Sequence, residues 1–480
     1  MPTDQYVCFK FGIMPGPDLV IRGKQVVIST TSLEGAESQS SVRAASVHIE
    51  KGRIIYVGSF DEITAGCELV TADDNSLVMP GLVDTHVHVN EPGRTDWEGF
   101  DTATRAAAAG GVTTLIDMPL NSIPSTTTLS AFYEKLGSAR GKCHVDVGFW
   151  AGVVPGNTQE LAALFEAGVV GFKCFLVHSG VNEFPNVTEE DLRKALPELV
   201  RLGAPLIVHA ELPGPIDRAC GISAPNTDNR RYQNFLNSRP PAAENEAIAL
   251  MIQLSREFGS NVHIVHLSSA GAIPTLRDAR SAGVMITAET CPHYLVFSAE
   301  EIPDGATEFK CCPPIRERDN CERLWQGLIE GTIDMVVSDH SPCPPDLKAS
   351  ASGNFQEAWG GISSLQLRLP VMWTAAQTRR VSSIVLIRWL CEKPAKLVGL
   401  GRRKGFLAAG FDADVVIWNP RHEFRVSADM IHHRHKLTPY SGRTLSGVVQ
   451  KTFLRGKKIY DDGAICSEPM GALLQRSFES

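Results

Sequence analysis

Five side chains that commonly bind metal ions lie at or near the ends of short apolar runs in the middle of this sequence. His86 and His88 form an HxH pair in DTHVH, and His209, His266 and Asp339 close LIVH, HIVH and VVSD. On a strand, positions i and i+2 point the same way, so the HxH pair can hold one ion together. A lone histidine is more often a packed core residue. Five such groups in equivalent places favour a site for Zn²⁺, Fe²⁺, Co²⁺ or Mn²⁺.

A lysine is expected in the same kind of position, because we place Lys173 at the end of the fourth strand, in GFKCFL. Burial near cationic groups lowers the pKa of a lysine amine. The neutral amine can react with CO₂ to give a carbamate, whose two oxygens can bridge two metal ions. The alternative is a salt-bridged lysine at the rim of the site, and spacing alone does not decide between them.

Strands followed by helices must position these side chains. We count eight apolar runs, and helical spacers separate them, many ending in glycine as helix C-caps do. The spacer at Thr188 opens with TEED, a helix-capping pattern. The runs are VMPGLVDTHVHV, GVTTLIDMP, VDVGFWAGV, VVGFKCFL, APLIVHAE, NVHIVHLS, GVMITAETCPHYL and IDMVVSDHSP. This alternation fits an open doubly wound α/β sheet or a (β/α)₈ TIM-type barrel. The count of eight favours the barrel, which brings all carboxyl strand ends to one face.

Both ends of the chain have a different, β-rich pattern. Residues 17–28 and 43–58, and the late runs GFDADVVIW, SGVVQKTFLRG and KKIYDDGAI, are short apolar segments separated by turn residues. The polar stretch TTSLEGAESQSS between the first two predicts an exposed loop. We therefore expect residues 1–78 and 401–480 to form one small β-sandwich domain, and residues 79–400 the barrel.

Composition limits the class of partner and the compartment. The 480 residues carry a net charge of −8, which argues against nucleic acid as a partner, and we see no apolar stretch long enough to span a membrane. The start MPTDQYVCFKFGIMPG lacks the pattern of a secretory or transit signal, and the final SFES is not a peroxisomal address. Twelve cysteines without a CxxC pair predict free thiols in a reducing compartment, with the cytoplasm favoured over peroxisome or mitochondrion. A redox or metal role for the neighbours Cys311 and Cys312 is disfavoured, because no second Cys/His cluster lies beside them.

The string GLVDTHVHVNEPGRTDWEGF resembles the signature of the amidohydrolase superfamily, and of its cyclic amidohydrolases in particular. The resemblance extends over nearly the whole chain and includes MPLNSIPSTT, GFKCFL, VHAE, HIVHLSS, AETCPHYL, KCCPPIR, SDHSPC and GFLAAGFDADVVIWNP. It implies a homotetramer with two divalent ions per site, zinc first among the candidates. In that site His86 and His88 would bind the more buried ion together with Asp339, His209 and His266 would bind the other, and carbamylated Lys173 (N6-carboxylysine) would bridge them.

The resemblance also implies a reaction. A hydroxide shared by the two ions would attack a ring carbonyl, and Asp339 would move its proton to the leaving nitrogen. Dihydroorotases of this family carry an arginine that grips the substrate carboxylate two residues after the HxH pair, where this chain has Asn90. The adjoining loops resemble those of enzymes that open the neutral ring of allantoin to allantoate in purine catabolism. The alternatives are a hydantoinase or dihydropyrimidinase activity, or a non-catalytic scaffold, which the intact ligand set disfavours.

Substrate contacts and supporting residues follow from the same resemblance. The candidate substrate contacts are Asn121, Ser341, and the backbones of Cys312 and Gly360, and Asn121 could equally be a turn residue. Arg94 is expected to anchor its loop. Six further histidines fall into two groups. His263, His293 and His340 are expected to orient neighbours or to lie behind the metal ligands, and His432, His433 and His435 to lie in a solvated loop outside the barrel face.

Overall fold

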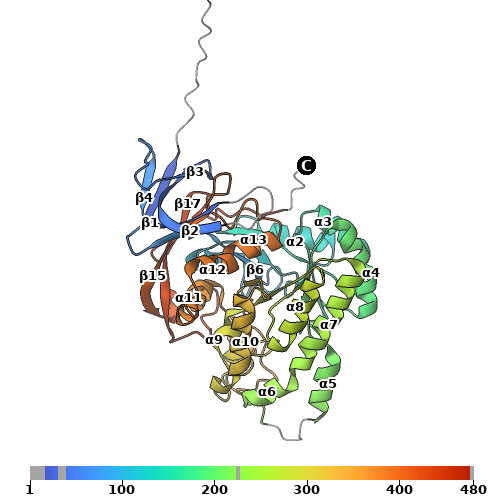
Figure 1. The fold of residues 1–480 in the computed structure, drawn as a ribbon. Coiled ribbons are helices and arrows are strands. Elements are labelled where there is room, and N and C mark those ends of the chain that lie inside the picture. The colour runs from blue at the N-terminus through green and yellow to red at the C-terminus, as the bar shows by residue number, and fades with distance from the viewer. Residues whose placement is uncertain (1–16, 31–38, 223–227, 476–480) are drawn as a thin grey trace, which may run out of the picture.

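The computed structural model describes residues 17–475, with gaps at 31–38 and 223–227 (Figure 1). The predictions made for the first sixteen residues and for the final SFES concern positions outside this part. Most of the polar loop predicted at 30–41 also lies outside it.

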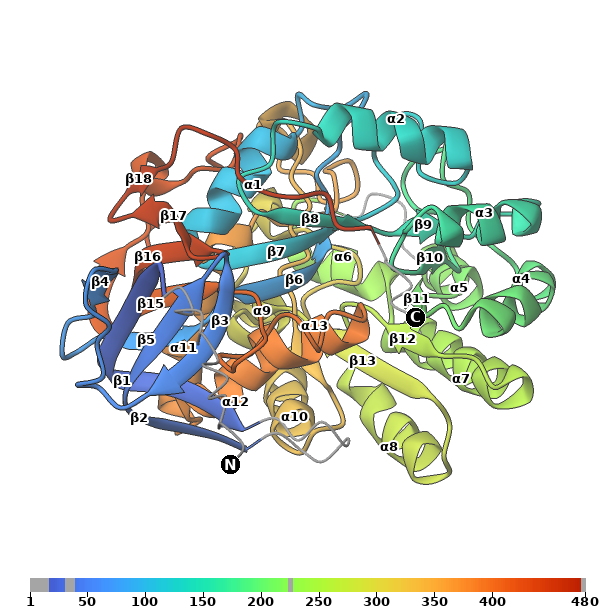
Figure 2. The same cartoon turned by 90° about the horizontal axis from the view of Figure 1, so that it is seen from above.

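Eight parallel strands form the barrel at the centre of the molecule, and Figure 2 shows helices lying around them. Strand pairing runs β6-β7-β8 and then β9 to β14, with β8 and β9 as successive parts of one strand that Trp150 interrupts. A parallel bridge between Val87 and His340 closes the ring. This closure confirms the barrel and excludes the open sheet. The strands are β6 (Leu82–Val87), β7 (Val112–Asp117), β8 (Asp146–Phe149), β9 (Ala151–Gly152), β10 (Phe172–Phe175), β11 (Leu206–His209), β12 (Val262–Ile264), β13 (Ile286–Thr290) and β14 (Met335–Val336).

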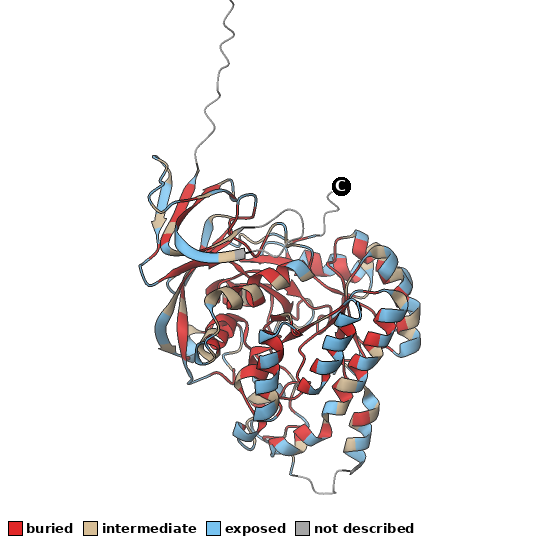
Figure 3. Cartoon of the chain, in the orientation of Figure 1, coloured by how far each residue is buried: buried red, intermediate tan, exposed pale blue. Residues whose placement is uncertain are grey.

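The helices bury one face against the strands and expose the other (Figure 3). In α4 (Glu189–Leu202) the predicted cap is present: Thr188 and Asp191 form a capping box, and Gly203 ends the helix at φ 64°. The other helices that follow barrel strands are α1 (Phe100–Ala109), α2 (Leu129–Ala139), α3 (Leu161–Glu166), α7 (Pro241–Phe258), α8 (Ile273–Ser281), α10 (Arg318–Ile329) and α11 (Arg368–Thr378). Shorter or intervening helices are α5 (Pro213–Ile222), α6 (Tyr232–Ser238), α9 (Pro292–Val296), α12 (Ser383–Ile387) and α13 (Lys393–Leu397).

Strands from both ends of the chain form the additional β domain, as expected. They make one mixed nine-stranded sheet, in the order β18-β17-β16-β15-β5-β1-β2-β3 with β4 beside β1. Its two halves share an apolar core that includes Val47, Ile54, Phe411, Val415 and Phe453. The strands are β1 (Leu19–Thr30), β2 (Gln39–Glu50), β3 (Arg53–Gly58), β4 (Glu68–Thr71), β5 (Leu77–Pro80), β15 (Val415–Arg425), β16 (Thr444–Leu454), β17 (Lys457–Asp461) and β18 (Ala464–Ile465). The expected domain limits at 78 and 401 stay a prediction.

A buried ion cluster joins this sheet to the amino-terminal end of the barrel. Lys404 Nζ lies 2.6 Å from Asp414 Oδ2, beside β15, and 2.9 Å from Asp146 Oδ2, at the start of β8. Arg455 also pairs with Asp146. In the described ranges, no helix has both the length and the apolar composition to cross a bilayer.

Candidate metal centre

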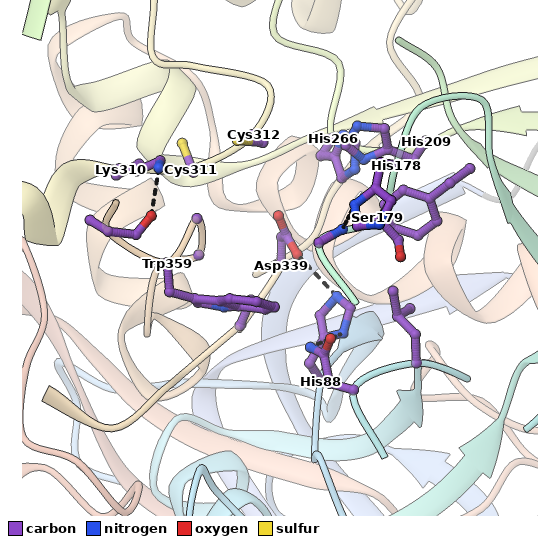
Figure 4. Close-up of a pocket in the computed structure, with 18 of the residues that line it drawn as sticks. His88, His178, Ser179, His209, His266, Lys310, Cys311, Cys312, Asp339 and Trp359 are labelled. Atoms are coloured by element: carbon purple, nitrogen blue, oxygen red, sulfur yellow. Dashed lines mark hydrogen bonds and ion pairs between the residues drawn. The ribbon is translucent and has the colours of Figure 1, made fainter. Parts of the chain in front are cut away.

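The barrel brings all six predicted metal ligands to one end of its interior, where they line one pocket (Figure 4). His86 Nε2 and His88 Nε2 lie 3.2 and 3.7 Å from Asp339 Oδ1. The His266 ring lies 5.4 Å from that of His86 and 4.6 Å from that of His209, between centroids. Five of the six groups lie near the carboxyl end of a barrel strand or within three residues after it, and Lys173 is the second residue of β10. The carboxyl end is where TIM barrels carry their active sites.

The backbone at these strand ends is unusual. His266 and Asp339 have φ values of 41° and 44°, and Asn90 and Asn121 have values of 66° and 70°. Non-glycine residues rarely adopt this left-handed region, and residues that do so concentrate at functional sites. The chain therefore turns sharply at four places around the pocket, and each turn directs a polar side chain.

Burial dominates the electrostatics of the site. Lys173 is fully buried, and loss of hydration lowers the pKa of its amine, although nearby Asp339 opposes the shift. Burial also raises the pKa of Asp339, against the opposing effect of Lys173. A buried lysine with a depressed pKa supplies the neutral amine that carbamate formation needs.

The donor atoms fit divalent metal ions. Lys173 Nζ, His86 Nε2 and His266 Nδ1 are buried and make no hydrogen bond to any described residue. Buried polar atoms without partners are costly, and metal coordination is one way to satisfy them. His86, His88 and Asp339 place one ligand atom each within 4.8 Å of one another. Imidazole and carboxylate ligands are those of zinc and similar ions.

The predicted substrate contacts line the same pocket, a cavity of about 280 Å³. Asn121 and Ser341 are almost fully buried, and Asn121 Nδ2 lies 3.4 Å from His88 Nδ1. Cys312 and Gly360 lie side by side: the distance from Cys312 Sγ to a Cβ built on Gly360 would be 3.1 Å. Asn121 is thus both a turn residue and a pocket residue.

Two loop residues support this pocket from outside it. Asn90 is buried and donates from Nδ2 to the Pro342 carbonyl at 3.3 Å. It provides no cationic clamp where dihydroorotases carry an arginine. Arg94 donates to the Asn121 carbonyl at 2.7 Å and pairs with Glu183, as expected of a loop anchor.

The three histidines expected to support the ligands differ in their contacts. His263 and His340 orient neighbours, since they contact Glu289 and Glu98 at 3.1 and 3.3 Å. His293 is fully buried, and neither of its ring nitrogens bonds to a described residue, so it does not orient a neighbour by hydrogen bonding. The cysteines in the described ranges are free thiols, including Cys311 and Cys312.

The prediction of a solvated loop at 432–435 was wrong for His433. Its side chain is fully buried, with the ring 5.3 Å from that of His340. The segment returns to the barrel, where the backbone N–H of His432 donates to Gln366 and His435 contacts the Asp96 carbonyl.

Sequence reasoning missed the groups that hold the ligands and the pocket wall. Glu289 and Glu211 lie 2.6 and 2.7 Å from His86 Nδ1 and His209 Nε2. Both glutamates fall inside the motifs AETCPHYL and VHAE, so an acidic residue at or just after a strand end was the available signal. Buried Lys348 Nζ donates to carbonyls of the wall, including that of Trp359 at 3.0 Å, and no pattern pointed to it.

Comparison with known proteins agrees with this geometry. The model of the amidohydrolase family matches residues 77–459. A protein of Streptomyces avermitilis named allantoinase is 48% identical over 464 residues, which cover 96% of this chain and all of that one. The allantoinase of Saccharomyces cerevisiae is 47% identical over 83% of this chain and 86% of its own. The solved structure of L-hydantoinase (dihydropyrimidinase) from Arthrobacter aurescens superimposes with a TM-score of 0.87 at 29% identity, covering 96% of this chain and all of that one. The chain therefore belongs to the amidohydrolase family.

Proposed function

We propose that this protein hydrolyses the cyclic amide of allantoin to give allantoate, in a site that holds two divalent metal ions. One observation carries the proposal: six ligand-type side chains converge in one pocket of a chain that matches an allantoinase from end to end at 48% identity. Hydrolysis by a metal-dependent enzyme is the chemistry of this family. The complete ligand set argues against the non-catalytic alternative.

The residues of the chain divide the work. His86, His88 and Asp339 would hold one ion, His209 and His266 the other, and Lys173 would bridge them as a carbamate, with zinc the first candidate metal. When bound, such a metal pair supplies an activated water and a Lewis acid. Asp339 is suited to accept a proton from that water and deliver it to the ring nitrogen that leaves, because its carboxylate lies beside both histidines that would hold the same ion.

The substrate ring would lie against the wall opposite the metal ligands. Asn121 and Ser341 offer side-chain hydrogen bonds, and the backbones of Cys312 and Gly360 offer further ones from the same cavity. The cations at the pocket are already engaged: Arg239 pairs with Glu211, and Lys310 donates to the Gln356 and Ala358 carbonyls. A neutral, ureido-rich ring suits such a site better than a ring acid does.

The nearest competing activity is that of a hydantoinase or dihydropyrimidinase, which the structural likeness favours. Purified, metal-replete protein offered allantoin, dihydrouracil and hydantoin in parallel separates the two. We expect the highest kcat/KM with allantoin. Dominant turnover of dihydrouracil would overturn the assignment.

Two further predictions concern the state of the protein in the cell. We infer a homotetramer, which light scattering of the purified protein would test. We also infer a reducing compartment, with the cytoplasm favoured, and the free thiols of the described chain support it.

A further inference from the structure

Each half of the metal-binding pocket contains one histidine whose second ring nitrogen meets a buried glutamate. Glu289 Oε1 lies 2.6 Å from His86 Nδ1, and Glu211 Oε2 lies 2.7 Å from His209 Nε2. Both glutamates are about 1% exposed or less. We propose that Glu289 and Glu211 are positioning residues, one for each metal ion, which hold the two histidines in opposite tautomers. This inference rests on the two-metal site of the proposed function.

Glu289 determines which nitrogen of His86 is free. A neutral imidazole carries one N–H, and a metal ligand must present the lone pair of the other nitrogen. Donation from Nδ1 to Glu289 leaves Nε2 as the ligand atom, and this atom lies 3.2 Å from Asp339 Oδ1. The bond thus directs His86 toward the ion that Asp339 and His88 would share.

Glu211 holds His209 in the opposite tautomer. Here Nε2 donates to the carboxylate, so Nδ1 is left to bind metal. The ring is also held from both sides. It stacks on Phe175 with the ring centroids 4.5 Å apart, and it meets His266 edge-on at 4.6 Å. Rotation of the His209 ring would break all three contacts.

Each glutamate is itself fixed by a further residue. Glu289 Oε2 lies 3.1 Å from His263 Nε2, and His263 Nδ1 lies 2.7 Å from Thr287 Oγ1. Glu211 accepts from Arg239 Nη1 at 2.5 Å, and Arg239 lines the pocket. The two carboxylates cannot shift without breaking these bonds, as expected of groups that orient metal ligands.

Glutamine replacement tests the proposal, because it keeps the shape of the side chain and turns one oxygen into a donor. In Glu289→Gln and Glu211→Gln we expect metal affinity to fall by about 10- to 100-fold. Proteins equilibrated against graded chelator are assayed for metal retained per chain by elemental analysis, without substrate. We expect each variant to release one ion at a chelator level at which the wild type retains both.

A matched control is Glu244→Gln. Glu244 is also buried, lies 2.6 Å from Arg316 Nη2 and accepts two backbone N–H groups, but no bond to a metal-site histidine is seen in the described chain. We expect this variant to unfold more easily yet bind metal as the wild type does. If Glu289→Gln fails to fold, Glu289→Asp gives the same comparison, because it keeps the charge and withdraws the carboxylate from His86.

The outcomes separate clearly. Retention of both ions at wild-type affinity in the Glu289 and Glu211 variants would overturn the proposal, and so would an equal loss of metal in Glu244→Gln. A wild-type protein that binds two ions but leaves allantoin intact would refute the proposed substrate. The same metal measurements would still test the positioning role.

Discussion

At the scale of single residues, the proposed pair of ions depends most on Lys173. It is fully buried, makes no hydrogen bond to the described residues, and lies 5.1 Å from the centre of the Phe175 ring. An ammonium ion would be strongly desolvated there, whereas a carbamate would be stabilised by metal ions on both of its oxygens. The setting therefore favours the modified side chain once metal is present.

Lys173→Ala should remove the bridge and lower kcat/KM by about 10³-fold or more, equivalent to about 4 kcal/mol of transition-state stabilisation. The vacated space can admit a small carboxylic acid, so formate, acetate or propionate should restore part of the activity. Steady-state kinetics with and without each acid check this, and the wild type with the same acids is the control. Full activity in the unrescued variant would contradict the bridging role.

A substitution at Gly361 tests the substrate contact proposed for Ser341. A Cβ at Gly361 would sit 2.3 Å from the Ser341 carbonyl oxygen, so alanine must displace one of the two backbones. We expect Gly361→Ala to raise KM about tenfold, or about 1.4 kcal/mol, with metal content unchanged. Gly137→Ala is the control, since Gly137 lies in α2 with open space around it and alanine favours the helix. Unchanged KM in Gly361→Ala would argue against a substrate role for Ser341.

The sequence predicted that these six side chains would meet in one pocket, because they lie at or near the ends of apolar runs and parallel strands bring such ends together. The ligand role of Lys173 followed from the family resemblance and not from its spacing. The hydrogen-bond partners of the six side chains could not be assigned in this way. Glu289 approaches His86 from a strand some 200 residues later, and nothing in the spacing tells which imidazole nitrogen it meets. His433 was placed in solvent because it lies in the C-terminal segment, outside the runs assigned to the barrel, while the contacts that bury it are non-local.

At the scale of elements, the ion cluster around Asp146 connects barrel strand β8 to the sheet formed by the chain ends. Asp146, Lys404 and Asp414 are buried, and Arg455 closes the cluster. Removal of one partner from a buried ion cluster leaves an uncompensated charge. The cluster therefore holds the two parts of the molecule in one arrangement.

Asp146→Asn should lower the free energy of unfolding by about 3–5 kcal/mol. Urea unfolding followed by circular dichroism measures this, and Asp278→Asn, on the exposed face of α8, is the control. Retention of wild-type stability in Asp146→Asn would show that the cluster contributes little.

The pH dependence of the same variant has a defined sign. Burial raises the pKa of Asp146, but the positive charges of Lys404 and Arg455 together lower it by more, so its net pKa shift is downward. The stabilisation is therefore present above the pKa of an unfolded aspartate, about 3.9, and is lost as pH falls through the folded value. The pKa of Asp414 shifts upward because of burial. The quantity that reports on Asp146 is therefore the difference in free energy of unfolding between wild type and Asp146→Asn, and not the wild-type value alone. That difference should shrink below about pH 4.

At the scale of the whole molecule, local pattern predicted the parts better than their connections. The eight predicted apolar runs correspond to the eight barrel strands, because each run is long enough to be recognised as a strand from its local sequence alone. The strand order of the additional sheet could not be predicted from the sequence, because β5 pairs with β1 on one side and with β15 on the other, and more than 300 residues of barrel separate β5 from β15. Pairing between strands so far apart in the chain depends on contacts that no local pattern encodes.

Removal of the metal ions should separate folding from function in the whole protein. The apolar core surrounds the barrel independently of the ligands, so the chelated protein should keep its far-ultraviolet circular dichroism while losing activity. Its unfolding should become easier, by about 4 kcal/mol per ion if metal had been present at 1,000 times its Kd.

Because Lys173 must react again with CO₂, recovery should require metal together with bicarbonate. Calorimetry and allantoin assays in CO₂-free buffer, with each addition alone and with both, check this. Full recovery with metal alone would contradict the carbamate, and an unchanged unfolding temperature on chelation would contradict the metal pair itself.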